Sequence, residues 1–260
     1  MGRRNKMIGC AFSFNGKCSL FNATRTLNFI SLLHLKVKRK MKIAAQILCL
    51  VLLMNPFFIQ AQKLYNEGTI TYNIVVQTGS NQAQAADLWD GATQKMIFKN
   101  QQTRTELKSL LGTTITIHDS RNGSAVVMNE YDQSKILIRM TKENYEDGNK
   151  KYAGIKFELK NETKIILGYK CSLAIATLSD GSTFKVYYAI DFVFQNKDYG
   201  PQFTGLPGVP LEYESELGKM KVTYIADKVS FDPVGAALFD VPKTGYREMT
   251  YEEVKKIKKN

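Results

Sequence analysis

The feature that most constrains the fold of this chain is a period-two alternation of apolar and polar residues, repeated in several short segments. Such alternation is typical of β-strands with one buried face and one polar face. The apolar faces are formed by Ile70, Tyr72, Ile74 and Val76; by Ile115 and Ile117; by Ile136, Ile138 and Met140; by Phe184, Val186, Tyr188 and Ile190; and by Met220, Val222 and Tyr224. We therefore predict a mainly β protein built on a meandering antiparallel sheet.

Turn signals separate these segments. Asn122-Gly123, Asp147-Gly148 and Asp180-Gly181 are dipeptides that favour positive φ and fit hairpin turns. The hairpin at Asp180-Gly181 is the most strongly indicated, because a strong strand pattern lies on each side. The acidic stretch 144–149 is interpreted as a loop.

Helix signals are few. Residues 84–90 are predicted to form a short helix that carries Leu88 and Trp89. At the C-terminus, Thr250 and Glu253 have the spacing of a capping box, so a helix is expected to begin there. Val254 and Ile257 are the apolar residues expected to hold that helix to the body of the protein.

The segment from Met41 to Ala61 has the three parts of a secretory signal peptide. Lys42 supplies a positive start, an apolar stretch follows, and Ala61 is a small residue at the expected cleavage point. An uncleaved membrane anchor is less favoured, because the apolar run is shorter than the ~20 residues that a spanning helix needs. Residues 1–40 are interpreted as a start codon assigned too early or as an extended leader, and residues 62–260 as a single domain.

This division changes what the charge implies. The whole chain carries +12, but residues 1–61 hold ten basic and no acidic side chains, which leaves +2 for the rest. The basic excess that would suggest a nucleic-acid partner thus falls in the segment expected to be removed, and we expect none.

Candidate catalytic residues are scarce. Beyond residue 61 there is one cysteine, Cys171, which shares an apolar face with Leu173 and is expected to be a small buried hydrophobe. There is one histidine, His118, expected to be solvated at a strand end beside Asp119. One cysteine and one histidine do not make a thiolate or histidine metal cluster. We therefore expect no enzyme, no catalytic residue, no metal and no cofactor.

The segment from Gly205 to Pro210 reads GLPGVP and has clear turn chemistry. Pro207 fixes φ for the second turn position, and Gly208 is predicted to supply the positive φ of a type II turn. The loop is interpreted either as a stiff crossover that orders the sheet, which turn chemistry alone explains, or as an apolar lip over a ligand cavity. Pro201 and Pro210 are expected at strand ends or a sheet edge, because proline cannot donate a ladder hydrogen bond.

Six aromatic residues cluster before and within this region, and two interpretations remain open. They pack a core and a sheet face, which aromatic residues favour in strands, or they line an apolar cavity. The six are Tyr187, Tyr188, Phe192, Phe194, Tyr199 and Phe203.

Three segments in order, KIILGYKCSLA (164–174), FKVYYAIDF (184–192) and YGPQFTGLPGVPLEY (199–213), resemble the GLPGLI family of secreted envelope proteins, which has no established activity. The chain departs from the family at Val209-Pro210 and at Tyr187. A weaker resemblance links MIFKNQQTRTEL (96–107) and FDVPKTGY (239–246) to half-barrels of the lipoprotein-carrier type. That resemblance implies a curved sheet, as a half-barrel or open barrel, and the binding of an apolar ligand.

The expected function is that of an exported, non-enzymatic envelope protein that binds or carries a lipid, a lipoprotein or another apolar ligand. It would act in the periplasm or at the cell surface, after cleavage near Ala61. The alternative is a structural or interaction protein with a filled core, which contacts other envelope proteins through a sheet edge near Pro201 and Pro210. The candidate ligand-binding residues are Trp89, Tyr188, Phe203, Gly205, Leu206, Pro207, Gly208, Val209 and Pro210.

Overall fold

The computed structural model describes residues 38–42, 46, 62–76, 89, 91–217 and 220–257. The chain divides into two compact units, Met1–Ile59 and Gln60–Asn260. In the first unit, residues 38–42 are helical. The expectations for the leader and the signal peptide fall almost wholly outside the described residues. None of the helices in the described part of the chain is long and apolar enough to cross a membrane.

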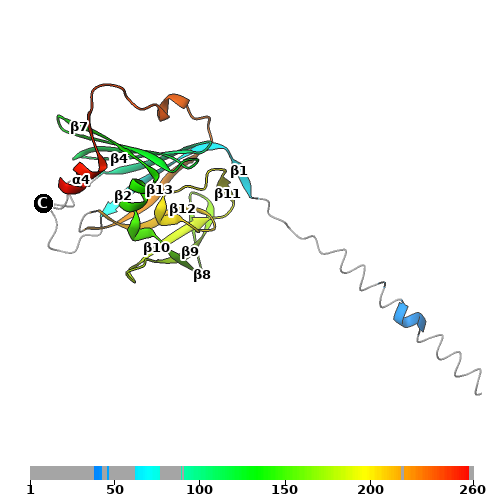
Figure 1. Cartoon of the computed structure of the whole chain (residues 1–260). Helices are drawn as coiled ribbons and strands as arrows, with labels where there is room; N and C mark the ends of the chain where they lie inside the picture. The colour runs from blue at the N-terminus through cyan, green and yellow to red at the C-terminus, as the bar shows by residue number, and fades with distance from the viewer. Residues whose placement is uncertain are drawn as a thin grey trace, which may run out of the picture. The chain divides into compact units, whose positions relative to one another are not determined.

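The second unit is built on one open, largely antiparallel sheet of twelve strands (Figure 1). Its strands are β2 (Glu67–Val76), β3 (Thr93–Lys99), β4 (Gln102–Ser109), β5 (Gly112–Asp119), β6 (Ser124–Tyr131), β7 (Ser134–Met140), β8 (Lys156–Ile166), β9 (Tyr169–Thr177), β10 (Thr183–Ala189), β12 (Val209–Leu217), β13 (Met220–Ser230) and β14 (Arg247–Met249). The order across the sheet is β14-β7-β6-β5-β4-β3-β2-β13-β12-β10-β9-β8. The edges, β14 and β8, each pair with one neighbour, so the sheet is open. The prediction of a mainly β, antiparallel fold is confirmed.

Two meanders meet in this sheet. Strands β2 to β7 follow one another directly, and β8, β9, β10, β12 and β13 form the second meander. They are joined where β13 pairs with β2, with Tyr224 opposite Ile74. Only β14 runs parallel to its neighbour, β7. The short strands β1 (Lys63–Tyr65) and β11 (Phe192–Phe194) form a separate parallel pair.

The turn predictions are partly right. Asn122-Gly123 joins β5 to β6, and Asp180-Gly181 joins β9 to β10. Asp147-Gly148 instead ends the helix α3 (Lys142–Gly148), so both the hairpin and the loop predicted at 144–149 are wrong. The helix forms because Thr141 and Asn144 make a reciprocal capping box, which satisfies two backbone N–H groups at its start.

The predicted C-terminal helix is present as α4 (Tyr251–Ile257). Its capping box is confirmed, since the backbone N–H of Thr250 donates to Glu253 Oε2 at 2.7 Å and Glu253 N–H donates to Thr250 Oγ1 at 3.2 Å. Val254 is half-buried, whereas Ile257 is 64% exposed and does not help to hold the helix. The helix predicted at 84–90 lies outside the described residues except for Trp89, which is in a turn.

The core has two parts on opposite faces of the sheet. The larger part covers one face of β2, β3, β13, β12 and β10 and includes Tyr72, Phe98 and Tyr213. The smaller part lies on the other face of β3 to β7, beneath the segment that carries the 3-10 helix η3 (Ala236–Phe239). The predicted apolar faces lie in these strands, except that Ile190 follows β10 and is 43% exposed.

Candidate functional site

A cavity with a volume of about 500 Å³ lies over the β3–β7 half of the sheet. It faces the same side of the sheet as the larger core, because Met96 of β3 stands opposite Ile70 of β2. Met96 and Tyr199 belong both to that core and to the cavity lining. The face that aromatic residues fill over β2, β13 and β12 is thus left hollow over β4 to β7.

The floor of the cavity includes one row of directly paired residues. Thr105 of β4 stands opposite Thr116 of β5, Thr116 opposite Val127 of β6, and Val127 opposite Ile138 of β7. All four line the cavity. Because neighbouring strands are ~4.8 Å apart, this row spans roughly 14 Å and changes from hydroxyl-bearing to aliphatic side chains along its length.

The row beside it is more polar. Thr114 of β5 is paired with Asn129 of β6, and both line the cavity. Thr114 Oγ1 donates to Asn129 Oδ1 at 3.0 Å and lies 2.6 Å from the hydroxyl of Tyr131. The hydroxyls of Thr105 and Thr116 make no hydrogen bond within the described part of the chain, so they are free to meet a ligand or water.

Helices α3 and α4 and the segment 199–202 complete the lining. Tyr145 and Asn149 come from the α3 region, and Tyr251 and Val254 come from α4. The two helices are tied together at Asp147, whose Oδ2 accepts from the hydroxyl of Tyr251 at 2.7 Å and from Lys255 Nζ at 2.5 Å.

The segment 199–202 is held by a partly buried hydrogen-bond cluster. The Asp198 carboxylate forms a hydrogen bond with His118 Nδ1. The backbone carbonyl oxygen of Asp198 accepts from Thr103 Oγ1 at 3.0 Å, and Asp198 Oδ1 accepts from the Gly200 N–H at 3.3 Å. His118 also stacks on Tyr145, with ring centroids 4.3 Å apart. Only 13% of the His118 side chain is exposed, so the prediction of a solvated histidine is wrong. Sequence could not reveal the partner, which lies 80 positions away.

The described lining of the cavity carries no charged side chain. It consists of Gln94, Met96, Thr105, Thr114, Thr116, Val127, Asn129, Tyr131, Ile138, Met140, Tyr145, Gly148, Asn149, Tyr199, Gly200, Pro201, Gln202, Tyr251 and Val254. Burial raises the pKa of Tyr145 and raises the pKa of Tyr199 to about 12. The hydrogen bond to Asp147 raises the pKa of Tyr251. These hydroxyls are therefore protonated at neutral pH and act as neutral hydrogen-bonding groups.

The residues predicted to bind a ligand lie elsewhere. Tyr188, Phe203 and Val209 are part of the larger core, and Trp89 and Leu206 pack against it. Pro210 is buried in β12, and Gly205 and Pro207 are exposed. None of the nine candidates lines the 500 Å³ cavity. The rings of Phe203 and Tyr213 meet edge to face, with centroids 4.8 Å apart. This part of the aromatic cluster therefore packs the core.

The turn in the GLPGVP segment differs from its prediction. The positive φ belongs to Gly205 (φ +89°), not to Gly208. Gly208 is needed for a different reason, because a Cβ there would overlap the carbonyl oxygen of Ala189 and lie 2.8 Å from Tyr188 Cδ2. Close approach of two backbones, and not a type II turn, therefore explains this glycine.

The two prolines mark no sheet edge. Pro201 begins the 3-10 helix η2 (Pro201–Phe203), and Pro210 stands opposite Tyr188 near the start of β12, at a bulge. Because β12 lies between β10 and β13, the sheet edge expected near these prolines is not there. The prediction that proline lies at a strand end does hold for Pro210.

Cys171 agrees with its prediction as a buried hydrophobe. It has no exposed surface, and burial raises the pKa of its thiol to about 11. Among the described residues, no group of three or more His, Cys, Asp or Glu side chains is placed to hold a metal ion.

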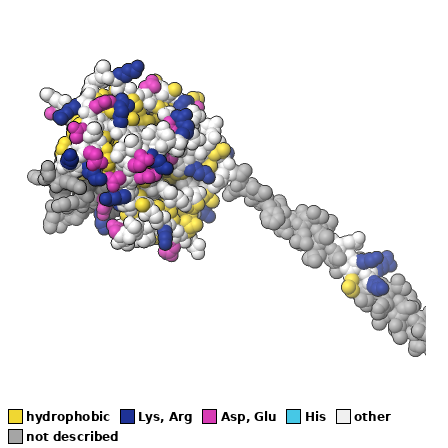
Figure 2. Space-filling model, viewed as in Figure 1, with side chains coloured by type: hydrophobic (Ala, Val, Ile, Leu, Met, Phe, Trp, Pro, Cys, Tyr) yellow, Lys and Arg dark blue, Asp and Glu magenta, His cyan; other side chains and the backbone are white. Residues whose placement is uncertain are grey.

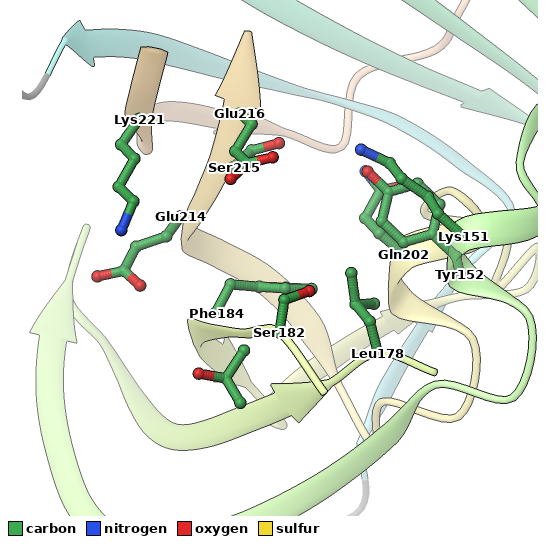
Figure 3. A pocket seen from close by; sticks show the side chains of 11 residues that line it. Lys151, Tyr152, Leu178, Ser182, Phe184, Gln202, Glu214, Ser215, Glu216 and Lys221 are labelled. Atoms are coloured by element: carbon green, nitrogen blue, oxygen red, sulfur yellow. The ribbon is translucent and has the colours of Figure 1, made fainter. Parts of the chain in front are cut away.

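A smaller cavity of about 160 Å³ is also lined in part by η2 (Figure 3). Figure 3 shows Lys221 and Glu214 on one side of it and Lys151 with Tyr152 on the other. Gln202 lines both cavities. The smaller one is charged and too small to enclose a ligand of the usual size, so the larger cavity is the better candidate site.

The distribution of surface charge does not indicate a particular class of partner. Figure 2 shows Lys and Arg side chains interspersed with Asp and Glu over the visible face of the β unit. A nucleic-acid surface typically has clustered basic residues, and that face does not.

Comparisons with known proteins leave the family open. No family model matches the chain, and the search of curated proteins found no match. Among solved structures, PNGF-II in space group C2 is matched at 16% identity and a TM-score of 0.43, over 74% of this chain and 32% of that one. PNGF-II in space group P21 gives 15%, 0.43, 74% and 33%, and MucB gives 12%, 0.25, 68% and 57%. The chain thus spans about a third of PNGF-II and just over half of MucB.

Proposed function

We propose that this chain is an exported, non-enzymatic envelope protein that binds or carries a lipid-like ligand in the cavity over β3–β7. The observation that carries the proposal is the cavity itself. Its volume of about 500 Å³ lies within the range of sites that enclose small ligands, and its lining mixes aliphatic, aromatic and neutral polar groups. Export is proposed from the signal-peptide pattern that ends at Ala61.

The chemistry of the lining favours binding over bond chemistry. General acid–base work uses groups with a pKa near the operating pH, typically His, Asp, Glu or Lys. The described lining offers threonine, amide and tyrosine side chains instead. Burial raises the pKa of the Cys171 thiol to about 11 and keeps it out of solvent, which disfavours a thiolate nucleophile.

The alternative, an interaction protein of the envelope, is favoured by a different observation. Most of the aromatic cluster and, from the GLPGVP segment, Leu206 and Val209 belong to the core or pack against it, so their role in this structure is packing. In that case the exposed edge strand β8, with Leu159 at 57% and Ile165 at 66% exposure, is the surface for a partner. Its charged side chains and the bulge between Leu159 and Thr163 limit unspecific pairing along that edge.

A dye-displacement titration distinguishes the carrier proposal from the interaction-protein alternative. 1-N-phenylnaphthylamine, an apolar dye that fluoresces on leaving water, is titrated into the purified protein and then displaced with fractions of an envelope lipid extract. Thr105→Trp places a large side chain on the cavity floor. Lys108→Trp places the same side chain on the opposite face of β4, where the lysine side chain is 63% exposed.

We expect the unmodified protein and Lys108→Trp to bind the dye equally, and Thr105→Trp to bind it at least about tenfold more weakly. Circular dichroism and the melting temperature confirm that the three proteins fold alike. A folded protein that does not bind the dye, or that binds it but releases it to no lipid fraction, would refute the carrier proposal and favour the interaction protein.

A further inference from the structure

We infer that the cavity over β3–β7 selects an uncharged amphiphile, with a headgroup of hydroxyl or amide groups and an aliphatic chain. The inference rests on the proposed function and adds the chemical class of the ligand. Three observations carry it: the neutrality of the lining, the free hydroxyls on the cavity floor, and the change from polar to aliphatic side chains across four strands.

Neutrality argues against an anionic or cationic headgroup. A buried charge is costly unless a counter-charge or several hydrogen bonds compensate for it. All nineteen described lining residues are uncharged at neutral pH. Close by, Asp147 at the junction of α3 and α4 is already compensated by Lys255 and does not supply a free charge.

The free hydroxyls define where the headgroup binds. Thr105 and Thr116 face each other across β4 and β5, and neither hydroxyl has a hydrogen-bond partner in the described part of the chain. Asn129 accepts from Thr114 through its oxygen, which leaves its amide N–H groups for a ligand. A hydroxylated headgroup supplies the donors and acceptors that these groups can use.

The aliphatic chain has its own place. Val127 and Ile138 continue the row from Thr116, and Met140 lies on the same strand as Ile138. Val254 of α4 lines the same cavity. Burial of these surfaces against a hydrocarbon chain is favourable in proportion to the apolar area removed from water.

Three probes with the same acyl chain test the inference. Monodecanoylglycerol carries two free hydroxyls, methyl decanoate carries none, and decanoate at pH 8 carries a negative charge. Each competes with 1-N-phenylnaphthylamine for the full-length protein. We expect monodecanoylglycerol to bind about tenfold more tightly than methyl decanoate, and decanoate to bind most weakly.

Matched variants locate the discrimination. In the double variant Thr105→Val/Thr116→Val, the affinity for monodecanoylglycerol should fall to that for methyl decanoate. The affinity for methyl decanoate itself should not change. Thr113→Val, on the opposite face of β5, should leave all three affinities as they were.

The outcomes separate this inference from the proposed function. Dye binding with equal affinity for the three probes, or with decanoate the tightest, overturns the inference and leaves the carrier proposal standing. Dye binding without displacement by any probe also overturns the inference. Failure of the folded protein to bind the dye at all overturns both.

Discussion

The hydroxyl of Tyr72 in β2 donates a hydrogen bond of 2.7 Å to the carbonyl oxygen of Pro210 in β12. The two residues are 138 positions apart, and the bond is buried. Tyr72 also meets Tyr213 edge to face at 5.6 Å. The last residue of the GLPGVP segment is thereby fixed to the centre of the sheet, which is the role expected of a crossover that orders the strands.

Tyr72→Phe should therefore destabilise the protein, because it leaves a buried carbonyl oxygen without this donor. The expected loss is about 1–2 kcal/mol in the free energy of unfolding, measured by urea denaturation. Tyr131→Phe, which removes an exposed hydroxyl, serves as the control and should change stability by less than about 0.5 kcal/mol. Equal stability of both variants would show that the Tyr72 bond contributes nothing net.

The two glycines of the same segment should respond differently to alanine. Gly208→Ala forces a Cβ into the carbonyl oxygen of Ala189, so we expect a loss of about 3 kcal/mol. Gly205→Ala meets no atom within 4 Å but keeps an unfavourable positive φ, at a cost of about 1 kcal/mol. Thermal or urea unfolding of the pair measures the difference, and the reverse order would contradict the observed backbone.

Cys171 should be inert while the protein is folded. Its thiol is fully buried and burial raises its pKa to about 11, so little thiolate forms at neutral pH. Iodoacetamide should modify Cys171 at least about 100-fold more slowly than it modifies the exposed thiol in Lys170→Cys, the neighbouring position on the opposite face. Peptide mass spectrometry follows both sites, and comparable rates would mean that this strand opens readily.

The contact between α3 and α4 should weaken in acid. The hydrogen bond from Lys255 is the main cause that lowers the pKa of Asp147, from an ordinary value of 3.8 to about 2. A carboxyl whose pKa is lower in the folded state stabilises that state above its ordinary pKa and loses this contribution as the pH falls through its folded pKa. Protection of α4 from hydrogen exchange should thus fall between pH 3.8 and about 2.

Asp147→Asn should abolish that pH dependence and leave α4 less protected than in the unmodified protein above pH 3.8, but not below about pH 2, where Asp147 itself is protonated. Glu252→Gln, also in α4, is the control and should keep the transition. If the loss of α4 protection in acid persists in Asp147→Asn, the titration of another group must cause it.

Period-two alternation was enough to predict five of the twelve strands and the antiparallel β class, because the burial of alternate side chains is a local property of each strand. The positions of Asp147-Gly148 and Gly208 were assigned from turn preference alone. Helix capping by Thr141 overrode that preference at the first, and the approach of Ala189 at the second. The cap at Thr141 involves Asn144 only three positions away, so the sequence already carried this signal. The approach of Ala189 to Gly208 joins residues from different strands and is not visible in a window of neighbouring residues.

The candidate site was harder to predict than the fold. Thr114 and Thr116 lie on the polar face of β5, and a polar strand face ordinarily meets solvent. The cavity becomes apparent only when the registers of β4 to β7 align these residues with Val127 and Ile138 and when α3 and α4 cover them. Aromatic residues were predicted to bind the ligand instead, because a dense group of aromatic side chains suits a cavity lining as well as a core.

Native mass spectrometry of the protein purified after export, without strong detergent, tests the central claim most directly. The account predicts a bound mass that is released on denaturation as a neutral, hydroxyl-bearing lipid, and that is lost from Thr105→Trp but kept by Lys108→Trp. A folded protein with a clean unliganded mass, unchanged after incubation with envelope lipid, would contradict it.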